Sequence, residues 1–349
     1  MHIAIDITPL ESGHSGRGVG VYTKNLIDSL KRYKKQHSYT LFTRKQKVPN
    51  SADIVHYPYF DPFFLTLPVR KHKPTIVTVH DLIPLVFPDK FLPGFRGSLT
   101  WTFQKMSLLG ARRVIADSNT SKDDVVRITG FSRNKIDTVY LAPSESSGKI
   151  TQKDILERVK KQYLLPDRFI LSVSDVNWNK NISGLLKTFF HIISRDRRLK
   201  LVLVGKAFLD SALVETQEIN RLIAELNLEP YIIRTGYVGD RELMVFYTLA
   251  GCLVQLSHYE GFGLPVLEAM KCGCPVVVSD TSSLTEISGP SVRVQLENAR
   301  GVISGILKVL DMSDVKRRQL VDQGYAWVSQ FTWQKTAKET VQSYERTLL

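Results

Sequence analysis

Cysteine is scarce in this sequence, and long apolar runs are absent from it. The 349 residues include three cysteines, Cys252, Cys272 and Cys274. They are too few for a disulfide framework, and no second Cys or His pair stands at metal-ligand spacing, so we expect buried thiols rather than a zinc site. No apolar stretch approaches the roughly 20 residues that a membrane-spanning helix needs. Residues 1–6 indicate a strand rather than a signal peptide, so the expected location is cytoplasmic, with membrane contact restricted to the periphery.

Acidic residues are also scarce, but only in one half of the chain. Residues 1–143 hold 21 basic and 11 acidic side chains, whereas residues 144–349 hold 26 and 23, within a total net charge of +13. No acid stands between Asp28 and Asp53, and seven basic residues fall there, within Lys31–Lys47. Such a surplus suits nucleic acid, a phosphate-bearing ligand or an anionic membrane. Hydrophobic residues at 43% exclude a disordered chain.

Short apolar runs rich in Val and Ile alternate with amphipathic stretches along the chain, which predicts parallel sheets covered by helices on both faces. The first series of expected strands is Ile3–Ile7, Tyr39–Phe42, Ile54–His56, Thr75–His80, Val114–Asp117 and Lys135–Val139. The second series is Phe169–Val173, Lys200–Val204, Ile232–Thr235, Gly251–Leu256 and Pro275–Ser279. We therefore predict an α/β protein with two doubly wound Rossmann-like domains, residues 1–165 and 166–330, that face a cleft.

The segment 257–280 carries the clearest chemistry. An expected strand runs into a loop with Gly261 and Gly263, and a helix is expected from about Leu264. Glycines allow close approach of the backbone, and a helix start offers free N–H groups to an anion, which together favour a diphosphate site. Glu260 and Glu268 flank the helix start and could accept hydrogen bonds from sugar or ribose hydroxyls. The alternative is a helix cap with an exposed glutamate.

This segment resembles the Glu-x7-Glu signature of the retaining glycosyltransferases of family 4, which have the GT-B fold. Further matching segments occur in the family's order along nearly the whole chain. They are residues 18–22 (Gly-Val-Gly-Val-Tyr), 78–84 (Thr-Val-His-Asp-Leu-Ile-Pro), 115–118, 180–181 (Lys-Asn), 204–206 (Val-Gly-Lys), 236–238 and 331–335. The resemblance also implies that residues 331–349 form a C-terminal helix that crosses back to the first domain.

The resemblance implies a role for each matching residue. The catalytic residues would be His80, Lys180 and Glu260, with Lys180 stabilising the departing nucleoside diphosphate. Glu268 would hold the ribose, and residues 236–238 would line the nucleobase. The donor-binding residues would be Gly18, Gly20, Lys206, Gly236, Tyr237, Val238, Gly261, Phe262, Gly263, Leu264 and Glu268.

One departure concerns the phosphate site. The family commonly pairs the phosphate lysine with a nearby arginine, which is missing before Lys180. Lys206, Arg234 or Arg17 could supply the charge from another loop. No Asp-x-Asp pair stands on a loop at the expected cleft, and the acids at 123–124 suit the start of a helix. The family needs no metal or cofactor for transfer, and since no positioned nucleophile is evident, we favour front-face departure and attack over double displacement.

The expected function is retaining transfer of a hexose, mannose favoured, from a GDP-sugar or UDP-sugar to a glycan or lipid-linked acceptor. The alternatives are another nucleotide-sugar enzyme such as an epimerase or a phosphorylase, although a pyridoxal-phosphate lysine context is missing, and a basic nucleic-acid-binding protein, for which no motif is present. Within the family, the sequence most resembles the bacterial mannosyltransferases and rhamnosyltransferases of surface polysaccharide synthesis. We expect Lys31–Lys47 and Arg70–Lys73 to contact anionic lipid at the inner face of the membrane.

Overall fold

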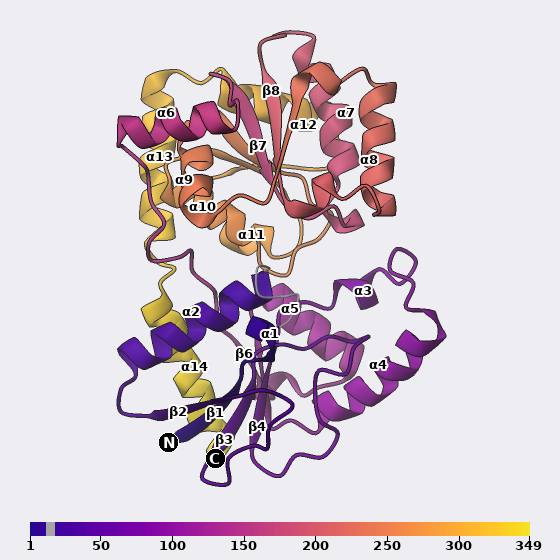
Figure 1. Cartoon of the computed structure of the whole chain (residues 1–349), viewed down its shortest axis with the longest axis vertical. Helices are drawn as coiled ribbons and strands as arrows, with labels where there is room; N and C mark the ends of the chain where they lie inside the picture. Colours follow the sequence, from indigo (N-terminus) through magenta and orange to yellow (C-terminus); the bar gives the residue numbers. More distant parts are fainter. Residues whose placement is uncertain (12–17) are drawn as a thin grey trace. The chain divides into compact units, whose positions relative to one another are not determined.

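The computed structural model describes residues 1–11 and 18–349. The chain divides into two compact units, one made of Met1–Ala142 with Phe331–Leu349 and the other of Pro143–Gln330. Each unit is built on a six-stranded sheet in which all pairs of neighbouring strands run parallel (Figure 1). The strands are short and nearly all buried on both faces, as parallel sheets under helices require.

The sheet of the first unit has the strand order β2-β1-β3-β4-β5-β6. Its strands are β1 (His2–Asp6), β2 (Ser38–Phe42), β3 (Ile54–Tyr57), β4 (Thr75–Val79), β5 (Arg113–Ala116) and β6 (Ile136–Thr138). Its helices are α1 (Thr8–Glu11), α2 (Gly18–Tyr33), α3 (Ile83–Val86), α4 (Gly94–Leu109), α5 (Asn119–Asp124), a π-helical turn at Val125–Thr129 and α14 (Trp333–Leu348). The order reverses between β1 and β3, which makes their carboxyl ends the expected binding edge.

The sheet of the second unit has the order β12-β11-β10-β7-β8-β9, the Rossmann arrangement. Its strands are β7 (Phe169–Val173), β8 (Lys200–Val204), β9 (Ile232–Gly236), β10 (Cys252–Gln255), β11 (Val276–Ser279) and β12 (Val292–Val294). Its helices are α6 (Lys153–Gln162), α7 (Ile182–Ile193), α8 (Val214–Glu225), α9 (Asp240–Leu249), α10 (Leu264–Lys271), α11 (Leu284–Ile287), α12 (Ala299–Leu310) and α13 (Asp314–Val328). The order reverses between β7 and β10.

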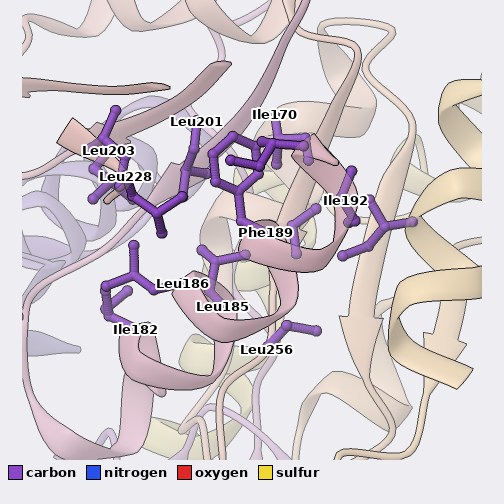
Figure 2. Packing of buried hydrophobic residues seen from close by; sticks show 14 of the residues in the cluster. Ile170, Ile182, Leu185, Leu186, Phe189, Ile192, Leu201, Leu203, Leu228 and Leu256 are labelled. Atoms are coloured by element: carbon purple, nitrogen blue, oxygen red, sulfur yellow. The ribbon is translucent and has the colours of Figure 1, made fainter. Parts of the chain in front are cut away.

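Helix α7 shows how the second unit builds its core. Its apolar residues Ile182, Leu185, Leu186 and Phe189 recur at helical spacing and are buried. Figure 2 shows these side chains beside those of the strands, among them Leu201 of β8. Each such burial contributes about 1.5 to 3 kcal/mol, so α7 is held firmly on the sheet and its first turn is a rigid support.

A buried polar chain joins α14 to the first unit. The hydroxyl of Tyr344 lies 2.7 Å from Nδ1 of His56, and Nε2 of His56 lies 2.9 Å from Oγ1 of Thr78. Thr78 in turn lies 3.1 Å from the hydroxyl of Tyr22 on α2. Burial, together with the nearby His80, lowers the pKa of His56 to about 3, so this ring is neutral. The last helix of the chain therefore packs within the first unit.

The expected strands correspond to β1–β11, whereas β12, with only three residues, was not predicted. The division between the units falls after Ala142, not at the expected boundary between residues 165 and 166. The reason is that α6 packs on α9 of the second unit, where Tyr163 donates a hydrogen bond to Glu242 over 2.7 Å. Within the described ranges, no helix has both the length and the apolar composition needed to cross a bilayer.

Candidate active site

The loops that follow β7 and β10 meet where the strand order of the second unit reverses. Two asparagines tie these loops together. Asn181, at φ +53°, caps α7 by accepting a hydrogen bond from Gly184 N over 3.1 Å, and its amide donates to Leu256 O over 2.9 Å. Asn179 donates to Tyr259 O over 3.0 Å. The residue between them, Lys180, is thereby held against the second loop.

Lys180 forms a two-pronged ion pair with Glu260. Its Nζ lies 2.7 Å from Oε2 and 2.9 Å from Oε1 of Glu260, and the side chains are 21% and 6% exposed. Oε1 also accepts from Gln255 Nε2 and from Ser257 Oγ, both over 2.7 Å. An ammonium group has three protons, of which two serve Glu260, so one remains for an anionic ligand. The structure brings together two of the three predicted catalytic residues.

Two serines missed by the sequence analysis fix the glycine loop. Ser282, at φ +45°, accepts a hydrogen bond from Glu260 N over 2.9 Å. Ser283 Oγ donates to the carbonyls of Glu260 and Phe262, each over 2.9 Å, and makes no side-chain cap of α11. Only the fold brings these two serines against a loop more than 20 residues earlier.

The start of α10 presents free donors beside this pair. Gly263 precedes the helix at φ +101°, a conformation that residues with a Cβ rarely adopt, so this position favours glycine. Neither Gly263 N nor Leu264 N has an acceptor among the residues that the structure describes. With Pro265 in the first turn, these N–H groups and the positive end of the helix dipole suit an anion.

Glu268 lies on the second turn of α10, where its Oε2 accepts a hydrogen bond from the hydroxyl of Tyr247 over 3.0 Å. Burial raises the pKa of Glu268 to about 7; Asp240 also raises it, while Tyr247 and Lys271 act in the opposite direction. Near neutral pH the carboxyl therefore exists in both forms. It can accept hydrogen bonds from a diol or donate one.

Replacing Glu268 with glutamine should reveal this pKa as a pH-dependent change in stability. The Glu268 carboxyl has a pKa of about 7 in the folded protein and an ordinary value of 4.5. Its contribution to the unfolding free energy is therefore fully present below pH 4.5 and is lost as the pH rises through 7. A glutamine side chain does not titrate, so the variant should not show this loss. The unfolding free energy of Glu268→Gln relative to wild type should therefore rise by about 1 to 3 kcal/mol between pH 4.5 and pH 7 and stay constant above that. Denaturant titrations across this range measure it. Exposed Glu218 of α8 supplies the control variant Glu218→Gln, and an equally flat difference for both variants would contradict the prediction.

Further expected donor residues follow β8 and β9. Gly236 ends β9 at φ +71°, and its carbonyl accepts from Gly205 N over 3.0 Å; Tyr237 is exposed and Val238 is buried. Lys206 is exposed and has no side-chain partner within the described residues. The guanidinium of Arg234 is held by Asn220 and Glu229, at 2.6 and 3.0 Å. Of the two candidate substitutes that the structure describes, Lys206 is thus the one without a side-chain partner; Arg17 lies outside the described residues.

The first unit holds His80 just after β4. Its Nδ1 lies 2.6 Å from Oδ2 of Asp117, its Nε2 lies 3.0 Å from Pro58 O, and its ring meets Tyr22 edge to face. Burial alone lowers the pKa of His80, but the charge and hydrogen bond of Asp117 outweigh it and raise the pKa above its ordinary value. Both ring nitrogens of His80 thus have a partner within the first unit, Asp117 for Nδ1 and Pro58 for Nε2. Asp117, whose second oxygen is buried without a partner among the described residues, was not predicted from the sequence.

The remaining predictions concern the glycine motif, metal ligands and thiols. Gly18 and Gly20, which the resemblance implies as donor-binding residues, lie in the first turn of α2. Across residues 1–11 and 18–349, no group of three or more His, Cys, Asp or Glu side chains could hold a metal ion. The three cysteines are free and buried, as expected.

Two family models match the sequence. The model described as "Glycosyl transferases group 1" matches residues 156–327, which contain Lys180, Glu260 and Glu268. The model described as "Glycosyltransferase Family 4" matches residues 44–142, which contain His80. Together they match a part of each unit.

Several characterised proteins are similar in sequence. O-antigen chain mannosyltransferase B of Escherichia coli is 28% identical over 308 residues, which is 88% of this chain and 79% of that protein. The serotype-specific mannosyltransferase WbdA of the same species is 27% identical over 279 residues, 78% of this chain. The chain spans about a third of the length of WbdA, since the match covers 34% of it.

Solved structures share the fold at lower identity. Sucrose-phosphate synthase from Thermosynechococcus elongatus matches with a TM-score of 0.76 and 18% identity over 99% of this chain and 98% of its own. HepE from Anabaena, solved in complex with UDP-glucose, matches with a TM-score of 0.73 and 17% identity over 99% of both chains. These likenesses confirm the predicted GT-B fold.

Proposed function

Because this chain belongs to glycosyltransferase family 4, we propose that it transfers a mannosyl residue from GDP-mannose to a glycan or lipid-linked acceptor, with retention and without a metal. The observation that carries the proposal is the likeness to a mannosyltransferase over 88% of the chain, joined to the ion pair of Lys180 and Glu260. Such a lysine matches the central electrostatic demand of the reaction, the stabilisation of a departing diphosphate.

The proposed donor site is built on the second unit. The diphosphate would lie on the free N–H groups of Gly263 and Leu264, with the third proton of Lys180 and the ammonium of Lys206 neutralising its charge. Glu268 would hold the ribose hydroxyls, and the backbone of residues 236–238 would line the base. Glu260 keeps Lys180 in place, and its Oε2, which accepts only the bond from Lys180 among the described residues, could contact the sugar.

The residues also support a proposal for the mechanism. Glu260 is enclosed by Lys180, Gln255 and Ser257, which makes it a poor candidate for a nucleophile in double displacement. We propose departure of the diphosphate and attack of the acceptor on the same face. Lys180 would then supply charge that other enzymes take from a metal, so a chelator should leave the rate unchanged.

Thermal unfolding with GDP-mannose, UDP-glucose and dTDP-sugars tests the donor. A ligand that binds the folded state raises the melting temperature by mass action, so GDP-mannose should give the largest shift. Incubation of the preferred donor with mannose oligosaccharides and with lipid-linked acceptors should yield a new glycoside. A larger shift with UDP-glucose, which was solved in complex with HepE, would contradict GDP-mannose as the donor and support a glucosyl donor instead. Conversion of the donor sugar without an acceptor would favour the epimerase alternative.

A further inference from the structure

Helix α4 of the first unit buries polar side chains and exposes a row of apolar ones, although its Leu108 belongs to the buried core. A helix on a soluble protein buries its apolar stripe and exposes its polar face. In α4 the side chains of Gln104 and Ser107 are fully buried, whereas Phe95 is 87% exposed. Leu99, Phe103 and Met106 continue the exposed stripe at helical spacing. Figure 1 shows α4 at the side of the first unit opposite α2.

Specific hydrogen bonds hold this orientation. Gln104 Oε1 accepts from Thr66 N and Thr66 Oγ1, over 3.0 and 2.8 Å, and from Leu67 N over 3.2 Å. Ser107 Oγ donates to Pro68 O over 2.6 Å and accepts from Lys71 Nζ over 2.9 Å. Rotating the apolar stripe inward would leave these buried polar groups without partners, at about 1 to 3 kcal/mol each. The outward stripe is therefore a property of the fold.

Further exposed apolar side chains lie on the two segments that these hydrogen bonds join. We call the whole set the α4 surface. It consists of Phe64, Leu65, Val69, Leu92, Phe95, Leu99, Phe103 and Met106. Single exposed apolar residues are ordinary, but such a concentration marks an interaction site.

The charges around the α4 surface select its partner. No acid stands between Asp61 and Asp81, and none stands between Asp89 and Asp117. Arg70 and Arg96, in these two stretches, are exposed, whereas Lys90 pairs with Asp89 over 3.2 Å and Arg113 with Asp137 over 3.0 Å. Exposed apolar side chains that share their segments with exposed arginines fit an anionic bilayer interface, where the apolar groups enter the acyl boundary and the cations meet the headgroups.

We propose that the α4 surface docks the enzyme on anionic lipid, with Phe95 and Leu99 inserted and Arg96 at the headgroups. The purpose of this contact rests on the proposed lipid-linked acceptor, but the observations that carry it are independent of the donor site. The inference moves the expected contact away from Lys31–Lys47. It also changes the role of residues 70–73, because Lys71 bonds Ser107 and Lys73 donates to Asn50 O over 2.7 Å.

Co-sedimentation of the full chain with vesicles tests the proposal. Wild type should bind phosphatidylglycerol vesicles and bind phosphatidylcholine vesicles much more weakly. The double variant Phe95→Ser, Leu99→Ser should weaken binding by about tenfold or more, since each side chain loses its burial in the interface. The control is Phe190→Ser, Val315→Ser, which removes two exposed apolar side chains of the second unit and should bind as wild type does. Equal binding by all three proteins would overturn the proposal.

Two further measurements separate this proposal from its rivals. If the α4 surface instead joins two copies of the chain, light scattering without lipid will show a dimer for wild type and a monomer for the double variant. The two proteins will then bind vesicles equally, and this result would overturn the proposed lipid contact. The thermal shift with GDP-mannose should be the same in the double variant and wild type, which shows a folded donor site. If the protein binds vesicles but GDP-mannose does not shift its melting temperature, the proposed donor is wrong and the proposed lipid contact is supported. If GDP-mannose shifts the melting temperature but the protein does not bind vesicles, the proposed lipid contact is wrong and the proposed donor is supported.

Discussion

Replacing Lys180 with methionine is expected to lower kcat/KM for sugar transfer by roughly a hundredfold to a thousandfold. Methionine keeps much of the length and volume of the side chain but removes the ammonium that would meet the diphosphate as its charge develops. The same change leaves Glu260, which is 6% exposed, without its countercharge. An uncompensated buried carboxylate costs roughly 3 kcal/mol, so the unfolding free energy should fall as well. A loss of activity in this variant alone therefore has two explanations.

The double variant Lys180→Met, Glu260→Gln separates them. It removes both charges and keeps an amide that Ser257 and Gln255 can still contact, so the unfolding free energy should recover most of its loss while transfer stays low. Lys187→Met, on the exposed face of α7, is the control that should change neither quantity by much. Initial rates at several donor concentrations and denaturant titrations provide the measurements. If the double variant regained activity together with stability, Lys180 would be a structural partner of Glu260 and not a catalytic residue.

The sequence predicted the parts of the fold that depend on local pattern. Runs such as Phe169–Val173 are apolar, β-branched and short, so their strands were evident without tertiary information. The three-residue strand β12 carries too little pattern to be recognised and forms because β11 offers it an edge. The boundary between the units was misplaced because Pro and Gly mark a break in the chain but do not tell on which side α6 packs.

The site shows the same division between local and tertiary information. Lys180 and Glu260 were found because each stands in a recognisable motif, but their ion pair spans 80 residues of sequence. Ser282, Ser283 and Tyr247 were missed because a serine or tyrosine far along the chain gives no sign of which backbone it will contact. Asp117 could have been found, since it follows β5 as His80 follows β4, and adjacent parallel strands bring such residues together.

The α4 surface is a third case, in which the sequence pattern is misleading. The apolar residues of α4 have helical spacing, and the ordinary inference from such spacing is a buried stripe. Only the contacts of Gln104 with the segment at Thr66 and Leu67 show that the stripe faces outward. A pattern identifies which residues share a face of a helix, and the packing decides which face is buried.

Replacing Gly205 with alanine is expected to damage the second unit more than any other change of similar size. A Cβ at this position would lie 2.1 Å from the carbonyl oxygen of Ser174, well inside the 3.0 Å that real contacts respect. The atom in the way is backbone, and it cannot turn aside as a side chain could. The loop after β7 would therefore have to move. Two backbone hydrogen bonds oppose that movement, from Ser174 N to Val204 O and from Gly205 N to Gly236 O, each over 3.0 Å. We expect the unfolding free energy to fall by about 2 to 4 kcal/mol.

The functional consequence follows from what that loop carries. Ser174 begins the segment that ends in Lys180, and Gly236 begins the one proposed to line the nucleobase, so a displaced loop should abolish the thermal shift given by the donor. Gly148→Ala is the matched control, because a Cβ there meets nothing within 4 Å; its unfolding free energy should change by no more than about 1 kcal/mol. Circular dichroism melts with and without nucleotide sugar measure both effects. If Gly205→Ala melted as wild type does and still responded to the donor, the close packing of the loops after β7, β8 and β9 would not be what positions Lys180.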